Sequence, residues 1–366
     1  MADDEKPIYE IDSDVNLPDP DEVPVRDRKV VTQPYDLAIH SLIEQVNSRT
    51  IFLRPLSERP RFQRQYVWTD KLASKLVESI LLKVPVPPCY LSQNDDFELD
   101  VIDGQQRIFS LYRFMENQFK LDGLEVISEL NGSRFFELEP KFQRQLSTFT
   151  LRCILITNES HPEIKFEVFE RLNSNTVPLN AQELRNCIYR GGFNDLLGTL
   201  SEGSLWLKIL GRRSPDKRLR DEELILRFFA FEIMGLNSYR TPLKHWLNEA
   251  AKAGRSFNAN KISQLGENWN SALAIVATWF PPNIAFRRPD SKAVNRALFD
   301  LVMSTAKKVD LEFAQRSSDI FFSLYRDILS DEEFLDLISR SVDHTKRTKR
   351  RFELWSERLE GPLIGG

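Results

Sequence analysis

A strand, a glycine turn and a helix start follow one another in Val101-Ile102-Asp103-Gly104-Gln105-Gln106-Arg107. The first two residues are β-branched, which is typical of a buried strand. Glycine permits the tight turn that the next step requires. From Ile108 to Phe114 apolar residues recur at helical spacing. We therefore expect the chain to pass from strand to helix at Gly104, with four polar side chains close to the helix N-terminus.

Polar groups of this kind at the start of a helix can bind a phosphate. The first backbone N–H groups of a helix lack internal partners, and the helix dipole is positive there. Arg107 offers a planar fork of donors that matches phosphate oxygens. Asp103 is a candidate ligand for a metal ion or a water, and Gln105 and Gln106 are candidates for orienting that water. The alternative is structural, because Asp-Gly is a common turn pair and a surface ion pair of Arg107 would contribute little.

Composition places the chain among soluble globular proteins. It has 366 residues, of which 41% are hydrophobic and 28% charged, enough for one large domain or two ordinary ones. The net charge of −4 gives no overall nucleic-acid signature, so any such contact must be local. No apolar run approaches the roughly 20 residues of a membrane helix, and we expect no membrane partner.

The cysteines and the chain start favour the cytoplasm. Cys89, Cys153 and Cys187 form no C-x-x-C pair, which argues against a zinc site or a disulfide framework and fits a reducing compartment. The acidic residues that follow Met1 are unlike the basic start of a signal peptide, so we expect none.

Hydrophobic patterns predict an α+β part followed by a mostly helical part. Residues 1–34 are acidic and proline-rich, typical of a disordered arm. The expected elements of the α+β part are helices at 37–46, 70–82 and 140–146, strands at 51–53 and 150–157, and a β-hairpin over 88–102. A proline also predicts a helix from 162, and Asn180 is a candidate cap for a helix over 181–188. The helical part should include helices at 222–233, 262–280, 294–309 and 334–342.

Basic residues are densest between Lys346 and Arg351. The favoured interpretation is the solvated face of a terminal helix. Contact with nucleic-acid phosphates is the alternative.

Four separated stretches occur in a characteristic order. They are Phe62-Gln63-Arg64 with Val67-Trp68; Glu78-Ser79-Ile80-Leu81 with Pro85-Val86-Pro87-Pro88; the Val101–Arg107 stretch; and Phe169-Glu170-Arg171-Leu172-Asn173 with Leu179-Asn180 and Glu183-Leu184-Arg185-Asn186. Together they resemble the N-terminal domain of GmrSD-type, modification-dependent restriction enzymes, a member of the wider ParB/sulfiredoxin-like class. Each motif alone has low specificity, but four in order at fitting spacings are a strong signal. The resemblance covers roughly residues 37 to 190.

The resemblance implies a small α+β fold that binds and hydrolyses a nucleoside triphosphate (NTP). Carried over, its motif assigns catalytic roles to Asp103, Gln105, Gln106 and Arg107, with Asp103 also holding Mg²⁺. The implied nucleotide-binding residues are Gly104, Arg107, Gln63, Arg64 and Trp68, with Asn173, Asn180 and Glu183 on the far side of the pocket. The expected domains are the arm at 1–34, a ParB/sulfiredoxin-like nucleotide-binding domain at 35–190 and a helical domain at 191–366.

The family setting implies prokaryotic defence against phage or foreign DNA. The restriction enzymes carry a C-terminal nuclease with a histidine–asparagine–histidine metal centre, and no stretch here resembles it. We therefore expect an NTPase module without its own nuclease. DNA and a separately encoded nuclease or other defence protein are its candidate partners.

Two other hypotheses remain open from the sequence. In the first, a non-catalytic adaptor contacts DNA phosphates through Arg61, Arg64, Arg107 and the basic run at 346–351. In the second, an antitoxin-like scaffold retains a vestigial pocket.

Overall fold

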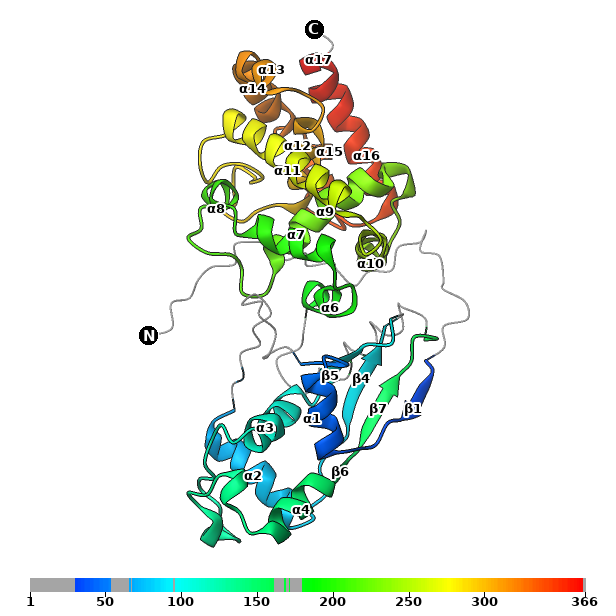
Figure 1. Ribbon diagram of the computed structural model, residues 1–366. Helices are drawn as coiled ribbons and strands as arrows, with labels where there is room; N and C mark the ends of the chain where they lie inside the picture. Colours follow the sequence, from blue (N-terminus) through cyan, green and yellow to red (C-terminus); the bar gives the residue numbers. More distant parts are fainter. Residues whose placement is uncertain are drawn as a thin grey trace. The chain divides into compact units, whose positions relative to one another are not determined.

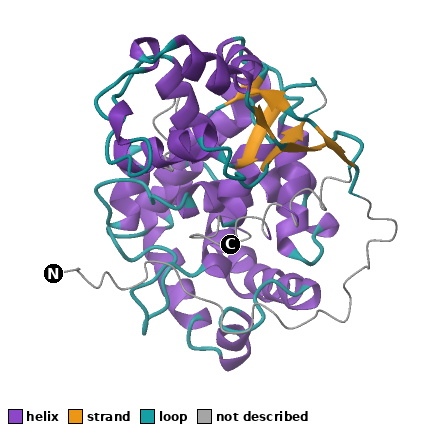
Figure 2. Cartoon of the chain, turned by 90° about the horizontal axis from the view of Figure 1, so that it is seen from below, coloured by secondary structure: helices purple, strands orange, loops and turns teal. Residues whose placement is uncertain are grey.

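The computed structural model describes residues 30–53, 66, 68–94, 96–160, 168, 171 and 180–364. These residues form two compact units, one within Arg26–Leu179 and one within Asn180–Gly366. We call them the sheet unit and the helical unit, because Figure 2 shows the strands confined to one part of the chain. No helix in the described ranges is both long and apolar enough to cross a membrane.

The sheet unit contains short strands and a group of helices (Figure 1). Its strands are β1 (Thr32–Pro34), β2 (Leu37–Ala38), β3 (Ile51–Phe52), β4 (Cys89–Gln93), β5 (Leu99–Asp103), β6 (Thr150–Leu151) and β7 (Cys153–Ile156). Its helices are α1 (Ile39–Asn47), α2 (Asp70–Leu81), α3 (Gln105–Met115) and α4 (Pro140–Thr148), with 3₁₀ turns η3 (Ser128–Leu130) and η4 (Phe135–Glu137).

Five strands form one mixed sheet in the order β1-β7-β4-β5-β3, and β2 pairs with β6 separately. The neighbours β4 and β5 are antiparallel, whereas β4 and β7 are parallel. Apolar residues of α1, α2, α3 and α4 pack with the strands into one core. This core holds β5 and α3 in fixed positions on both sides of Gly104.

Helix α2 shows how the sequence specifies this packing. The Thr69 side chain accepts the backbone N–H of Leu72 and so caps the helix. Buried Glu78, a residue of the second motif, accepts three backbone N–H groups of residues 125–127 at 2.8 to 3.2 Å. A carboxylate can accept several N–H groups at once, so this motif residue anchors a loop within the fold.

Most predicted elements of the sheet unit are confirmed, with two corrections. The hairpin over 88–102 exists as β4 and β5. The predicted disordered arm was wrong at its end, because Thr32–Pro34 pairs with β7 as an edge strand. The predicted strand at 150–157 is divided between β6 and β7. The helix expected from residue 162 lies outside the described residues.

The helical unit is built from α6 to α17. Its helices are α6 (Ala181–Ile188), α7 (Gly192–Ser201), α8 (Ser204–Leu210), α9 (Arg220–Met234), α10 (Leu243–Gly254), α11 (Ala259–Trp279), α12 (Arg296–Ala306), α13 (Leu311–Arg316), α14 (Ser318–Ile328), α15 (Glu332–Leu337), α16 (Thr345–Trp355) and α17 (Gly361–Ile364), with turns η6 (Leu236–Ser238) and η7 (Ser356–Glu360). Helices α9, α11 and α12 confirm three predictions, whereas α15 ends five residues before the predicted limit of 342.

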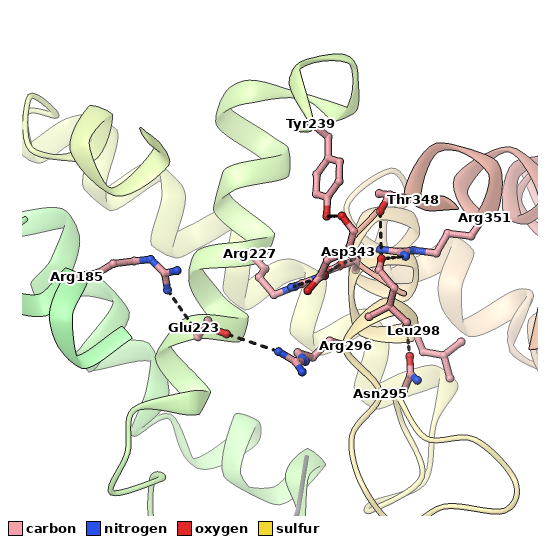
Figure 3. Close-up of polar contacts among 12 residues, drawn as sticks. Arg185, Glu223, Arg227, Tyr239, Asn295, Arg296, Leu298, Asp343, Thr348 and Arg351 are labelled. Carbon is pink, nitrogen blue, oxygen red and sulfur yellow. Dashed lines mark hydrogen bonds and ion pairs between the residues drawn. The ribbon is translucent and has the colours of Figure 1, made fainter. Parts of the chain in front are cut away.

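The core of the helical unit contains a buried charged network as well as apolar groups (Figure 3). Arg227 of α9 and Asp300 of α12 are both fully buried and form two parallel hydrogen bonds. Arg351 of α16 lies 3.7 Å from the same carboxylate, and Asp343 lies 3.5 Å from Arg227. Three helices are therefore joined through one aspartate.

Candidate functional site

Gly104 forms the turn between β5 and α3 in a left-handed conformation, with a φ of 92°. The space beside its Cα is closed. A Cβ atom there would lie 2.3 Å from the Sγ atom of Cys89 and 2.9 Å from its Cβ atom. Glycine is thus required for two independent reasons, the backbone conformation and the close approach of β4.

Arg107 links this turn to the start of β4. Its guanidinium donates to the Asp103 carboxylate at 2.6 Å and to the backbone carbonyl of Pro87 at 2.7 Å. The Arg107 side chain is 13% exposed and the Asp103 side chain 40% exposed. Because the carboxylate is partly hydrated, the pair contributes little to stability, and the Asp103 carboxylate remains accessible to solvent.

The N-terminus of α3 has no side-chain cap among the described residues. The first intrahelical bond runs from Ile108 to the carbonyl of Gly104, so the N–H groups of residues 105–107 precede the helical ladder. The side-chain nitrogen of Gln105 is buried and has no hydrogen-bond partner in the described part of the chain. The unpartnered Gln105 amide therefore belongs to the first residue of a helix whose N-terminus has no side-chain cap, and such a helix start favours an anion.

Tyr66 and Trp68, the described residues of the 60–68 loop, lie against α3. The Trp68 backbone N–H contacts the Gln106 side-chain oxygen at 3.4 Å. The Tyr66 hydroxyl lies 3.0 Å from the Ser110 hydroxyl, and the Tyr66 ring packs edge-on against Phe109 with centroids 4.9 Å apart. The structure therefore places Trp68 beside the predicted site. Gln63 and Arg64 lie outside the described residues.

Two cysteines that no sequence motif connects, Cys89 and Cys153, lie side by side near the Gly104 turn. Cys89 and Cys153 are fully buried and lie opposite each other in the parallel pairing of β4 and β7. Their mutual hydrogen bond, helped by the charge of Arg107 and opposed by burial, lowers the pKa of the Cys89 thiol. The same bond and burial raise the pKa of Cys153. The predicted hairpin could have indicated Cys89, because the first strand of an antiparallel hairpin begins opposite the end of the second strand, next to Gly104.

Asn180 and Glu183 belong to the helical unit, where they form a reciprocal cap of α6. The Asn180 side chain accepts the Glu183 backbone N–H at 2.9 Å, and the Glu183 carboxylate accepts the Asn180 N–H at 2.7 Å. Glu183 also pairs with Arg218 at 3.0 Å. Asn173, predicted beside them, lies outside the described residues. Their placement in the nucleotide site stays a prediction.

The Asn180→Ala substitution separates these two roles. We expect a loss of about 1 kcal/mol of unfolding free energy from the lost cap, measured by chemical denaturation. If nucleotide binding is unchanged at the same time, Asn180 acts only in the fold. A large loss of nucleotide binding without a change in stability would contradict a capping role.

The last two residues of the fourth motif, Arg185 and Asn186, form buried polar contacts on α6. Arg185 is 1% exposed and donates to Glu223 at 2.9 Å (Figure 3). It also donates to Asn248 at 3.0 Å. Asn186 donates to buried Glu222 at 2.6 Å. Buried polar side chains need partners of this kind, so these motif residues fasten α6 to α9 and α10.

The basic run at 346–351 has internal partners. Arg347 pairs with Asp336 at 2.6 Å and Arg350 with Glu333 at 2.8 Å, while Arg351 is fully buried. These three arginines therefore connect α16 to its neighbours and to the core. Arg61 and Arg64, the other arginines of the DNA-adaptor hypothesis besides Arg107, lie outside the described residues.

The described residues contain no cluster of three or more His, Cys, Asp or Glu side chains with metal-binding geometry. Asp103 is the carboxylate closest in sequence to the α3 N-terminus. A single carboxylate suits Mg²⁺ that arrives with phosphate and water ligands, because Mg²⁺ retains several waters and is seldom held by a dedicated protein cage. The donor set thus fits Mg²⁺ only together with a phosphate ligand.

Comparison with known proteins gives one match. Residues 39–190 match the family model described as "GmrSD restriction endonuclease, N-terminal domain". No curated protein and no solved structure matches the chain. The matched range includes the Gly104 turn, α3 and the α6 cap. Residues 39–190 of this chain are therefore similar to the N-terminal domain of GmrSD restriction endonucleases.

Proposed function

We propose that this chain is an NTP-binding and NTP-hydrolysing module of a prokaryotic restriction or anti-phage system, which acts with a separately encoded nuclease. The observation that carries the proposal is the group of donors at the Gly104 turn. The Arg107 guanidinium, the buried Gln105 amide and the uncapped N–H groups of α3 lie within five consecutive residues. The family match supports the restriction setting.

The Asp103–Arg107 ion pair could open so that each residue binds a part of the ligand instead. Asp103 and Arg107 neutralise each other at 2.6 Å. A Mg²⁺-bound triphosphate offers each of them a partner of opposite charge, because the carboxylate can take the cation and the guanidinium can take phosphate oxygens. One ion pair would then be replaced by two. Arg107 would also keep its bond to the Pro87 carbonyl, which fixes the direction of its guanidinium.

Hydrolysis at this site would depend on positioning and charge. A water oxygen would form a bond to the γ-phosphorus as the bond to the β–γ bridging oxygen breaks. The nucleoside diphosphate would leave, and the water would release a proton to the solvent. Gln105 and Gln106 would orient the water, a role that glutamine has in other phosphoryl-transfer enzymes. Arg107 and the α3 N–H groups would stabilise the charge on the phosphates. Bound Mg²⁺ would supply further neutralisation of these oxygens.

Thermal unfolding in the presence of Mg²⁺ and each of ATP, GTP, CTP and UTP tests the binding step. A ligand at 100 times its Kd stabilises the folded state by about 2.7 kcal/mol, so the melting temperature should rise with one or more nucleotides. We expect Arg107→Ala to abolish this rise. Arg144→Ala is the matched control, because Arg144 lies exposed on α4 in the same unit.

The two variants also separate binding from folding. The circular dichroism spectrum of Arg107→Ala should match that of the unmodified chain, since its ion pair is partly hydrated. If the variant loses its folded spectrum, Arg107 is a structural residue. If no nucleotide shifts the melting temperature of the unmodified chain, the proposal fails.

A further inference from the structure

A cavity lies wholly within the helical unit, and neither the motifs nor the family match accounts for it. Its volume is about 890 Å³. It is lined by the end of α8 with Gly211 and Arg212, by residues of the 283–292 loop, and by one face of α14 with Leu329 and Ser330. We call it the α8–α14 pocket. Its volume lies within the range typical of sites for small ligands.

The lining of the α8–α14 pocket is strongly basic and contains no carboxylate. The basic residues are Arg212, Arg287, Arg288, Lys292 and Arg326. Two of them have acidic neighbours: Arg212 lies 3.3 Å from Asp221, and Arg288 lies 3.7 Å from Asp290. The remaining three make no ion pair with any residue that the structure describes.

Arg287 is held in place without a counter-charge. Its guanidinium donates to the backbone carbonyls of Leu210, Ala285 and Lys292 at 2.8 to 3.0 Å. Burial lowers the pKa of this guanidinium. A half-buried cation fixed only by carbonyl dipoles retains its positive field, which attracts an anion. Lys292 and Arg326 are exposed and add two mobile charges.

Apolar and aromatic side chains form a further part of the wall. They are Leu210, Ile284, Pro289, Phe322, Tyr325 and Leu329. Ile284 is 43% exposed although it is large and apolar. Gly211 has a φ of 72°, and the Asn283 side chain occupies the position that a Cβ atom would take there. This contact joins the 283–292 loop to the end of α8 and gives the wall a fixed shape.

We propose that the α8–α14 pocket binds a nucleoside phosphate unit, either as a free nucleotide or as the 5′ end of a strand. Three cations without carboxylate partners would bind the phosphate, since arginine forks match its oxygens. The apolar wall would cover the flat base, which an inorganic anion lacks. The site is separate from the Gly104 turn, because all its lining residues belong to the helical unit.

Fluorescence anisotropy with a single-stranded deoxyoligonucleotide tests this site. The probe carries a 5′-phosphate and a 3′ fluorescein, and AMP serves as the competitor. We expect the double variant Lys292→Glu/Arg326→Glu to bind the probe at least about tenfold more weakly, because each lost charge-assisted bond has an effect of this size. Lys252→Glu is the matched control, because Lys252 is exposed on α10 outside the pocket.

The outcomes distinguish a free nucleotide from a strand end as the ligand, and the α8–α14 pocket from the Gly104 turn as the site. Competition by AMP supports a free nucleotide as ligand, and binding that AMP does not displace supports a strand end. Arg107→Ala should leave probe binding unchanged, so failure of the proposed NTPase does not affect this test. The inference is overturned if the full chain neither binds the probe nor gains thermal stability with AMP, if Lys252→Glu weakens binding equally, or if Arg107→Ala abolishes it.

Discussion

The Asp300→Ala substitution is expected to lower the free energy of unfolding of the helical unit by about 3–5 kcal/mol. Asp300 is fully buried and accepts from Arg227 at 2.5 and 3.0 Å, and Arg351 lies 3.7 Å away. Both arginines are themselves fully buried. Removal of the carboxylate would leave Arg227 with only Asp343 at 3.5 Å and would take away the carboxylate 3.7 Å from Arg351. A buried charge that loses its partner is far more costly than the pair is favourable.

Urea denaturation followed by tryptophan fluorescence measures this loss. Five of the six tryptophans lie after residue 180, so the signal reports mainly on the helical unit. Asp319→Ala is the control, because Asp319 lies in the exposed first turn of α14. It should change stability by no more than about 0.5 kcal/mol, as is usual for surface positions. A loss below 1 kcal/mol for Asp300→Ala would contradict the central role of this carboxylate.

Gly104→Ala should destabilise the sheet unit by about 2–5 kcal/mol. The left-handed conformation, with a φ of 92°, costs an ordinary residue about 1–2 kcal/mol. Overpacking against Cys89, whose Sγ atom lies 2.3 Å from the new Cβ position, adds about 1–3 kcal/mol. Hydrogen exchange measured by mass spectrometry in peptides that contain β4 and β5 reports this loss locally.

A double-mutant cycle separates the cost of the backbone conformation from the cost of the contact with the Cys89 Sγ atom. Cys89→Ala removes the Sγ atom but leaves the Cβ atom at 2.9 Å. The double variant Cys89→Ala/Gly104→Ala should therefore recover part of the lost protection, with a coupling of at least about 0.5 kcal/mol. Strict additivity would show that the contact with the Sγ atom does not contribute to the loss. Unchanged exchange in Gly104→Ala would contradict the close packing of the turn.

Local patterns were sufficient to predict the strand–turn–helix at Gly104. Alternating and helical spacing report on residues that are close in sequence, and the turn, the hairpin and α3 are all of this kind. The Asn180 cap was predictable for the same reason, because a capping side chain acts within three residues. These features do not depend on which distant segments pack against them.

Pairing between distant segments was not predictable. The parallel pairing of β4 with β7, and so the meeting of Cys89 with Cys153, joins residues 64 positions apart. Edge strand β1 has only three residues, too few for a pattern. The bond from Arg107 to the Pro87 carbonyl likewise depends on how β4 approaches the turn, which no local signal specifies.

The α8–α14 pocket was not predictable from the sequence either. Its cations come from separate segments of the chain, and no motif unites Arg212, Arg287 and Arg326. The densest basic stretch of the sequence is instead the run at 346–351, in which Arg347 and Arg350 form ion pairs with Asp336 and Glu333. Density of charge along a sequence does not reveal whether acidic partners surround it, because those partners come from other helices.

Phosphate release is the most direct test of NTP hydrolysis at the Gly104 turn. It should be measured with Mg²⁺ and each of ATP, GTP, CTP and UTP, with and without DNA. We expect turnover of at least one nucleotide. Arg107→Ala should lower the rate roughly a hundredfold or more, as removal of a transition-state donor does, while Arg144→Ala keeps it. No release under any condition, or equal rates in the Arg107→Ala variant, would contradict hydrolysis at Asp103–Arg107.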